Sequence, residues 1–308
     1  MTESPQINAI LQRLTVKIES VLHGTGVICK LSETAESLFV ITAKHNVCGS
    51  EFRDTPTFKN VRLSFLWDVQ SSPPQYHTYA LRPNDQILCS ESNDEDLCVI
   101  IVNRLTIESL IGELPTIRLT NNPDIFGSVI FRGFPDAYCG EEAIRMNGHI
   151  MELRKPLPYS IEIEVKTELV AKWLPADVEE DRTALDNSVG FSGSGLFIRT
   201  SDDSIYLLGI VRKLGRFNRF FCTNIEQINP ILEKANLPPV TLDTVFPFTS
   251  KQVLSMERFI AEYENTKWAT PLSNKFIGRI EELKTTTQSL SNNTITIVTG
   301  SGGPSRHC

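Results

Sequence analysis

The chain has 308 residues, which is enough for one two-lobed domain of about 200 to 250 residues with an appendage, or for two ordinary domains. Its 41% hydrophobic and 22% charged residues are typical of a globular protein with a sizeable core. The formal charge of −7 argues against a general nucleic-acid binder, because phosphate neutralisation needs a basic face, although it leaves room for a local basic patch. The polar N-terminus lacks the features of a secretory signal, and no apolar run approaches the roughly 20 residues that span a bilayer. We therefore expect a cytoplasmic protein with no nucleic-acid or membrane partner.

Short β-rich runs, separated by turn-forming clusters, extend from about residue 12 to residue 224. Long amphipathic helices between strands, the mark of parallel α/β folds, are missing from this region. The pattern predicts an all-β fold, either a sandwich or a pair of barrels. The expected strands lie at residues 14–18, 26–29, 38–42, 97–102, 128–132, 160–165, 195–199 and 205–211.

The first stretch with residues suited to catalysis is Phe-Val-Ile-Thr-Ala-Lys-His-Asn. In it an expected strand ends in small residues, and His45 follows in a loop. A strand end fixes the imidazole and leaves it open to a substrate, as a general base requires. A lone histidine after a strand is more often a surface or structural residue. His45 is therefore a candidate base only in combination with the stretches that follow.

The second stretch is Asn-Asp-Glu-Asp-Leu-Cys-Val-Ile-Ile-Val, an acidic cluster that leads directly into an apolar strand. The last carboxylate, Asp96, is drawn toward the interior, where it can accept the ring N–H of a histidine and fix its tautomer. A solvated acidic turn is the alternative; it suits Asp94 and Glu95 better than Asp96.

The third and most specific stretch is Asp-Asn-Ser-Val-Gly-Phe-Ser-Gly-Ser-Gly, residues 186–195. A nucleophilic serine needs a tight turn whose N–H groups converge on the developing oxyanion, and flanking glycines permit that turn. Ser192 is the candidate nucleophile, with the amides of Gly190 and Ser192 as oxyanion donors. A flexible Gly/Ser loop is the alternative.

Seven cysteines are scattered along the chain without a CxxC pair, and several lie in apolar runs. We expect buried free thiols, with neither a disulfide framework nor a zinc site, and we expect no metal and no cofactor. The cysteines are Cys29, Cys48, Cys89, Cys98, Cys139, Cys222 and Cys308.

Together, the Thr-Ala-x-His, Asp-Leu-x-apolar and Gly-x-Ser-Gly-Ser-Gly elements resemble those of trypsin-like (chymotrypsin-fold) serine peptidases, particularly the disulfide-free bacterial branch. The resemblance covers roughly residues 12–236 and keeps the family's order, His45, Asp96, Ser192. It implies two six-stranded antiparallel barrels with a triad between them, followed by a helix at about 226–236. It also implies acyl transfer on a protein or peptide substrate: Ser192 attacks, His45 moves the proton and Asp96 orients His45.

Two departures from the family pattern stand next to the candidate catalytic residues His45 and Ser192. Phe191 stands where secreted members hold an aspartate that pairs with a freshly cut N-terminus, so we expect no activation by that route. Asn46 follows His45, where secreted members carry a cysteine. Ser194 is the competing nucleophile, but the resemblance favours Ser192.

The substrate pocket is less well specified than the triad. Asp186 lies six residues before Ser192, where trypsin-like members place the carboxylate that selects Arg or Lys. Arg212, Lys213, Arg216 and Arg219 crowd the opposite wall, and they can neutralise Asp186 or select an acidic side chain instead. Asp186 can equally serve only to structure its loop.

The sequence changes character after residue 224, where helical spacing of apolar residues appears. We predict a protease domain over 1–236, a helical linker over 237–270 and the truncated start of a nucleotide-binding domain over 271–308. Residues 274–303 resemble the opening of a STAND-type NTPase, but Ser305, Arg306 and His307 stand where its phosphate loop needs Gly, Lys and Ser/Thr. We therefore predict no NTP binding.

In prokaryotic STAND proteins an N-terminal trypsin-like domain acts as an effector, often in antiviral defence. The resemblance implies that role, with oligomerisation through the missing NTPase part. The main alternative is a catalytically inactive trypsin-like module that binds peptides or acts as a scaffold. A structural β-rich protein whose three stretches match by chance is the third reading.

Overall fold

The computed structural model describes residues 5–68, 75–121, 128–136, 141–154, 160–165, 189–199, 204–214 and 219–243. All of them belong to one compact unit, Met1–Ser250. Among these residues, every helix is too short or too polar to cross a membrane. The predicted linker beyond residue 243 and the region 271–308 lie outside the described residues.

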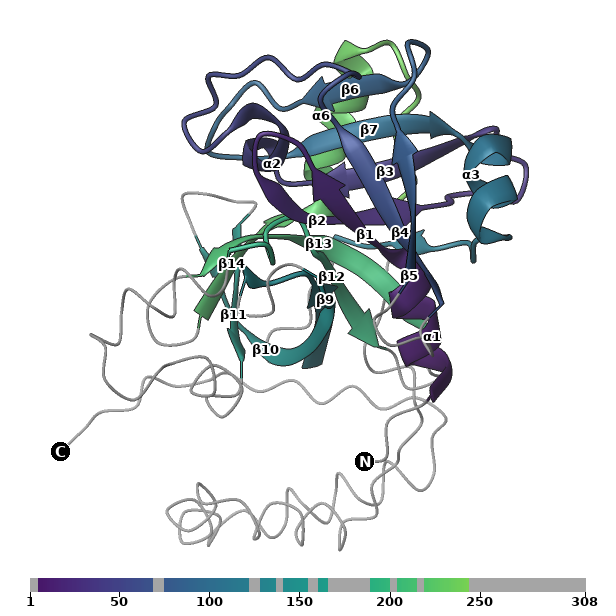
Figure 1. The fold of residues 1–308 in the computed structure, drawn as a ribbon. Coiled ribbons are helices and arrows are strands. Elements are labelled where there is room, and N and C mark those ends of the chain that lie inside the picture. The colour runs from purple at the N-terminus through teal and green to yellow at the C-terminus, as the bar shows by residue number, and fades with distance from the viewer. Residues whose placement is uncertain are drawn as a thin grey trace, which may run out of the picture. The chain divides into compact units, whose positions relative to one another are not determined.

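The first sheet contains seven antiparallel strands in the order β5-β4-β1-β2-β3-β7-β6, drawn in purple to blue in Figure 1. Strand β3 begins half-buried at Ser37 and ends buried, and the short helix α2, Lys44–Cys48, follows it. The strands are β1 (Thr15–Glu19), β2 (His23–Cys29), β3 (Ser37–Thr42), β4 (Arg62–Asp68), β5 (Gln75–Ala80), β6 (Gln86–Cys89) and β7 (Cys98–Asn103).

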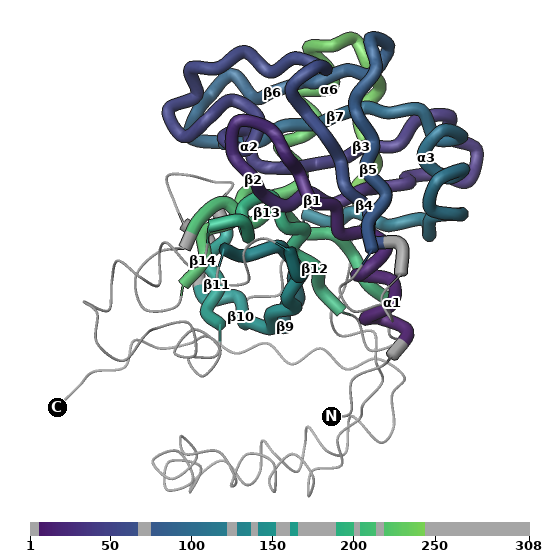
Figure 2. Tube along the Cα trace, in the orientation of Figure 1, coloured from purple at the N-terminus to yellow at the C-terminus, as the bar shows by residue number. Residues whose placement is uncertain are grey.

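The second sheet closes on itself, because β12 pairs with both β9 and β13. The result is a six-stranded antiparallel ring in the order β12-β9-β10-β11-β14-β13, visible as the teal and green loop of Figure 2, and β8 joins β13 in parallel. The strands are β8 (Arg118–Leu119), β9 (Ser128–Gly133), β10 (Ile144–Arg154), β11 (Ser160–Val165), β12 (Gly195–Arg199), β13 (Ile205–Leu214) and β14 (Arg219–Asn224).

Two helices at the ends of the described chain both pack on the core of the first sheet. Helix α1 (Pro5–Leu14) buries Ile7, Leu11 and Leu14, whose spacing places them on one helical face. After the 3₁₀ turn η2 (Ile225–Gln227), helix α6 (Ile228–Lys234) returns from the second sheet to contact β6 and β7 (Figure 1). A further helix, α3 (Arg104–Ile111), follows β7.

The predicted all-β fold of two antiparallel units with a closing helix is confirmed; the second sheet contains the expected six-stranded barrel, and the first sheet has seven strands. Each predicted strand is present, with ends that differ by up to three residues, and α6, Ile228–Lys234, lies within the helix expected at about 226–236. The sequence did not predict α1. Residues 237–243, assigned to the start of the linker, run along the protease unit without helical structure, and the Asp243 amide donates to the Leu119 carbonyl.

Candidate active site

His45 lies on helix α2 directly after the buried end of β3. Ala43, the residue before the helix, is extended, and His45 follows in the first turn. The neighbouring Lys44 fixes the helix, because its Nζ donates to the Ser90 carbonyl at 2.8 Å and to Asn93 Oδ1 at 2.9 Å. The His45 side chain is 21% exposed, so the imidazole is held by the protein and still reaches the surface.

Asp96 meets His45 through both of its carboxylate oxygens. Oδ1 accepts the His45 backbone N–H at 3.0 Å, and Oδ2 lies 2.7 Å from His45 Nδ1. Because an ionised carboxylate only accepts, Nδ1 carries the proton and the neutral ring presents a lone pair at Nε2. Asp96 is buried, whereas Asp94 is exposed, as the sequence predicted for the two carboxylates.

The backbone of Asp96 adopts φ +47°, in the left-handed region that non-glycine residues rarely occupy. The Asp96 carbonyl accepts the Lys44 N–H at 3.2 Å, so a backbone hydrogen bond joins the Asp96 segment to helix α2. This conformation costs on the order of 1 kcal/mol and turns the carboxylate toward α2.

Ser192 completes a chain of hydrogen bonds, with its Oγ 2.7 Å from His45 Nε2. The same Oγ lies 2.7 Å from the Arg212 carbonyl, which is a second acceptor for the hydroxyl proton. A hydroxyl carries one proton, so it donates either to the neutral imidazole or to Arg212. Only the first arrangement directs the hydroxyl proton toward the imidazole.

The turn around Ser192 depends on two glycines with positive φ. Gly190 has φ +97° and Gly193 has φ +89°. A Cβ on Gly190 would lie 2.0 Å from the Phe134 carbonyl oxygen, and one on Gly193 would lie 1.8 Å from the Thr25 carbonyl oxygen. Both the conformation and the close approach of backbone therefore require glycine at these positions.

The carbonyl groups of Val189, Gly190 and Ser192 each accept a hydrogen bond from another segment of the chain. The Val189 carbonyl accepts the Asp136 N–H at 2.7 Å, and because a trans peptide points its N–H the opposite way, the Gly190 N–H faces away from Asp136. Within the described residues nothing accepts the N–H groups of Gly190 and Ser192. The two predicted oxyanion donors are therefore available to a bound group.

Thr25 and Asn46 join the serine turn to the first sheet, a role that the sequence did not predict for either residue. Thr25 Oγ1 donates to the Gly190 carbonyl at 2.6 Å and accepts the Phe134 N–H at 3.0 Å. The Ser192 carbonyl accepts the Thr25 N–H and Asn46 Nδ2, each at 2.8 Å. The sequence signal for Asn46 was its place directly after His45, which puts its side chain near the candidate site.

The two other residues singled out in the turn are buried. Phe191 packs edge-on against Phe131 and Phe220, at centroid distances of 5.5 and 5.9 Å, and anchors the turn in the core of the second sheet. Ser194 is fully buried, and its Oγ has no hydrogen-bond partner among the described residues. Of the two candidate serines, Ser192 is thus the one joined to His45.

A cavity of about 270 Å³ opens over this arrangement, lined by His45, Gly190, Ser192, Arg212, Lys213 and others. The Arg212 guanidinium hydrogen-bonds the Asp94 carbonyl. Arg219 pairs with the buried Glu162 at 2.7 Å. Asp186 and Arg216 lie outside the described residues, so the predicted specificity of the pocket stays a prediction.

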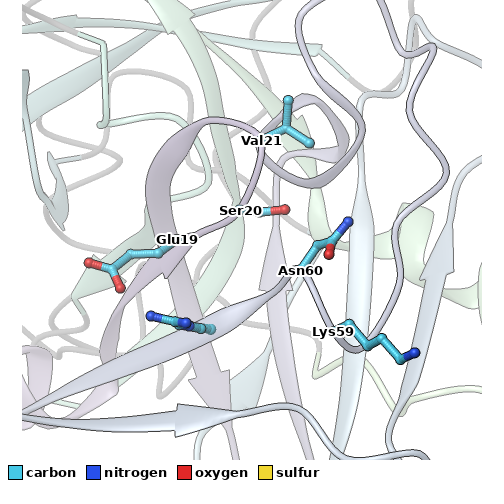
Figure 3. Close-up of a pocket in the computed structure, with 6 residues that line it drawn as sticks. Glu19, Ser20, Val21, Lys59 and Asn60 are labelled. Atoms are coloured by element: carbon cyan, nitrogen blue, oxygen red, sulfur yellow. The ribbon is translucent and has the colours of Figure 1, made fainter.

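A second hollow lies away from the triad, next to β1 and β4 (Figure 3). All of its lining residues except Val21 are polar, and in the close-up the charged ends of Glu19 and Lys59 point away from each other. No described group of three His, Cys, Asp or Glu side chains is arranged to hold a metal ion. Among the described residues, His45, Asp96 and Ser192 are the candidate catalytic side chains that hydrogen bonds join in one chain.

No family model and no curated protein matches the chain. Solved structures similar to it include the Rv3671c protease of Mycobacterium tuberculosis in its active form, with 17% identity and a TM-score of 0.44 over 79% of this chain and 91% of that one. A serine endoprotease from Yersinia pestis shows 16% identity and a TM-score of 0.47 over 76% of this chain and 66% of that one. The roles of individual residues therefore rest on geometry.

Proposed function

We propose that this chain is a serine endopeptidase that cleaves protein substrates through an acyl-enzyme, with His45, Asp96 and Ser192 as its triad. The observation that supports the proposal is the continuous hydrogen-bond chain from Asp96 Oδ2 through the His45 ring to Ser192 Oγ, with both links at 2.7 Å. Each group has the chemistry its role needs: an acceptor, a neutral imidazole and a hydroxyl.

In the proposed acylation step Ser192 Oγ attacks the scissile carbonyl carbon while its proton passes to His45 Nε2. The imidazolium is stabilised by Asp96, and the N–H groups of Gly190 and Ser192 donate to the oxyanion. His45 then returns the proton to the leaving amine, and the C–N bond breaks. Water, deprotonated by His45, hydrolyses the Ser192 ester in the second half of the reaction.

The experiment that tests this function is labelling with a fluorophosphonate probe, compared between the wild-type chain and Ser192→Ala. We expect labelling of the wild type and none of the variant. Ser194→Ala is the matched control and should label like the wild type. Absence of labelling in both wild type and Ser192→Ala would favour the inactive peptide-binding module. Labelling retained in Ser192→Ala would contradict the choice of nucleophile.

We also propose, from the resemblance in residues 274–303 alone, that the protease serves as the effector of a STAND-type protein. The test is the nucleotide sequence that follows codon 303. A continuation in any frame that encodes the Gly, Lys and Ser/Thr of a phosphate loop supports this setting. An unrelated or absent continuation contradicts it and leaves the peptidase proposal unaffected.

A further inference from the structure

Three free cysteines meet next to the segments that present His45 and Asp96. Cys48 is the last residue of α2, Cys89 the last of β6 and Cys98 the first of β7. The Cys48 and Cys89 sulfurs are 3.8 Å apart, and Cys89 faces Cys98 across the strand pair. The proposed hydrolysis uses none of these thiols.

The three thiols differ in exposure and in acidity. Cys89 is partly exposed, whereas Cys48 and Cys98 are buried. A hydrogen bond from the Cys98 thiol lowers the pKa of Cys89 most, and a hydrogen bond from Cys48 and the charge of Lys44 lower it further. Burial raises the pKa of Cys48. Cys89 is therefore the thiol of the cluster that ionises most readily and also its most exposed member, the two properties that a reactive cysteine needs.

We infer that Cys89 and Cys48 form an oxidisable pair that reacts with hydrogen peroxide and closes to a disulfide between β6 and α2. The Cys89 thiolate attacks one peroxide oxygen, the O–O bond breaks, and Cys89 becomes a sulfenic acid as hydroxide leaves. The Cys48 sulfur, losing its proton, then attacks the Cys89 sulfur and displaces the sulfenic oxygen as water. The two thiols together lose two electrons, and the peroxide is reduced to water.

The geometry requires little movement for this step. The sulfurs must approach from 3.8 Å to a bond length of about 2.05 Å, within the reach of side-chain rotation and a small shift of α2. Lys44 already holds α2 to this strand end through the Ser90 carbonyl. Cys89 directly precedes Ser90 and the turn that carries Asp96, and Cys48 lies on α2 with His45. The disulfide would therefore link α2 covalently to the Asp96 segment, which the His45–Asp96 hydrogen bond already joins to it.

The oxidised chain should therefore be the more stable one. The bond would close a loop between residues 41 positions apart, which restricts the unfolded chain. For a domain of this size we expect the melting temperature to rise by about 5 °C on oxidation and to fall back on reduction with a thiol.

The experiment treats the full chain, with Cys139→Ser and Cys308→Ser to remove thiols outside the described residues, with hydrogen peroxide. Peptide mapping should show one reversible crosslink, between Cys48 and Cys89. Cys48→Ser should stop at a sulfenic acid on Cys89 that dimedone traps, and Cys89→Ser should form neither product. Cys98→Ser should still crosslink, at a lower rate. Ser192→Ala should crosslink like its parent, so this result is independent of the proposed hydrolysis.

A Cys89 that stays reduced in the folded chain, or a crosslink from Cys89 to Cys98, would overturn the inference. So would a crosslink that forms only above the melting temperature. Mapping of the parent chain, which keeps all three cysteines, gives this answer even if Cys48→Ser fails to fold.

Discussion

The two halves of the candidate site are built in different ways. In the first sheet, His45 and Asp96 are positioned by side-chain hydrogen bonds, and their residue types carry the chemistry. In the second, the turn around Ser192 is positioned by backbone conformation, and Gly190 and Gly193 matter because they have no side chain. The first half should therefore fail chemically when it is changed, and the second half should fail geometrically.

The two halves also depend on each other through a few bonds. Thr25 of β2 contacts the serine turn through its backbone N–H and its hydroxyl, and Asn46 contacts it through its amide. Four substitutions test this comparison, beginning with the one of largest effect.

Asp96→Asn should lower kcat by about 10⁴-fold while leaving the fold intact. The amide can donate to His45 Nδ1, which favours the tautomer that carries its proton on Nε2 and cannot accept from Ser192. Steady-state hydrolysis of a peptide substrate measures the effect, with melting temperature as the control for folding. A loss below tenfold would show that Asp96 does not set the tautomer.

Gly190→Ala should lower kcat by about 10²- to 10³-fold through loss of an oxyanion donor. The added Cβ would lie 2.0 Å from the Phe134 carbonyl oxygen, so the turn must move. The measurement is kcat together with the rate of fluorophosphonate labelling, since both need the donor. Gly112→Ala, at a positive φ outside the site, is the matched control for backbone strain. Equal kcat in the two variants would contradict the role of Gly190.

Thr25→Val should lower kcat by about tenfold and the free energy of unfolding by about 2 to 3 kcal/mol. Valine keeps the shape of threonine and leaves the Gly190 carbonyl and the Phe134 N–H without the Thr25 hydroxyl. Denaturant unfolding and kcat measure the two effects. Thr25→Ser keeps the hydroxyl and should recover most of the rate. No recovery by Thr25→Ser would indicate packing rather than hydrogen bonding as the cause.

Ser194→Ala should have the smallest effect, with kcat within twofold of the wild type. The Ser194 hydroxyl is buried without a hydrogen-bond partner among the described residues, so its removal should leave the free energy of unfolding equal or raise it by up to about 1 kcal/mol. Thermal unfolding and peptide hydrolysis test both statements. A large loss of kcat would give Ser194 a part in the reaction.

Much of the fold was predictable because its strands are short apolar runs that end at turn residues, a pattern that the pleated strand imposes locally. Helix α1 was not predicted, although Ile7, Leu11 and Leu14 have helical spacing, because polar residues separate these three apolar ones. The residues of the pocket wall could not be ranked, since charge alone does not say which of Asp186, Arg212 and Arg219 faces a substrate.

The sequence by itself determined the residue types of the site. It also determined the order of His45, Asp96 and Ser192, and it predicted the burial of Asp96 from the apolar strand that follows. Tertiary structure alone decided that Thr25 and Asn46 hold the serine turn, that Asp136 fixes the Gly190 peptide, and that Cys48 meets Cys89. The physical reason is that a local sequence pattern encodes only the periodicity of the backbone. These contacts join segments that are distant in the sequence. Only the packing of the two sheets, or of α2 against β6, brings those segments within hydrogen-bond or van der Waals distance.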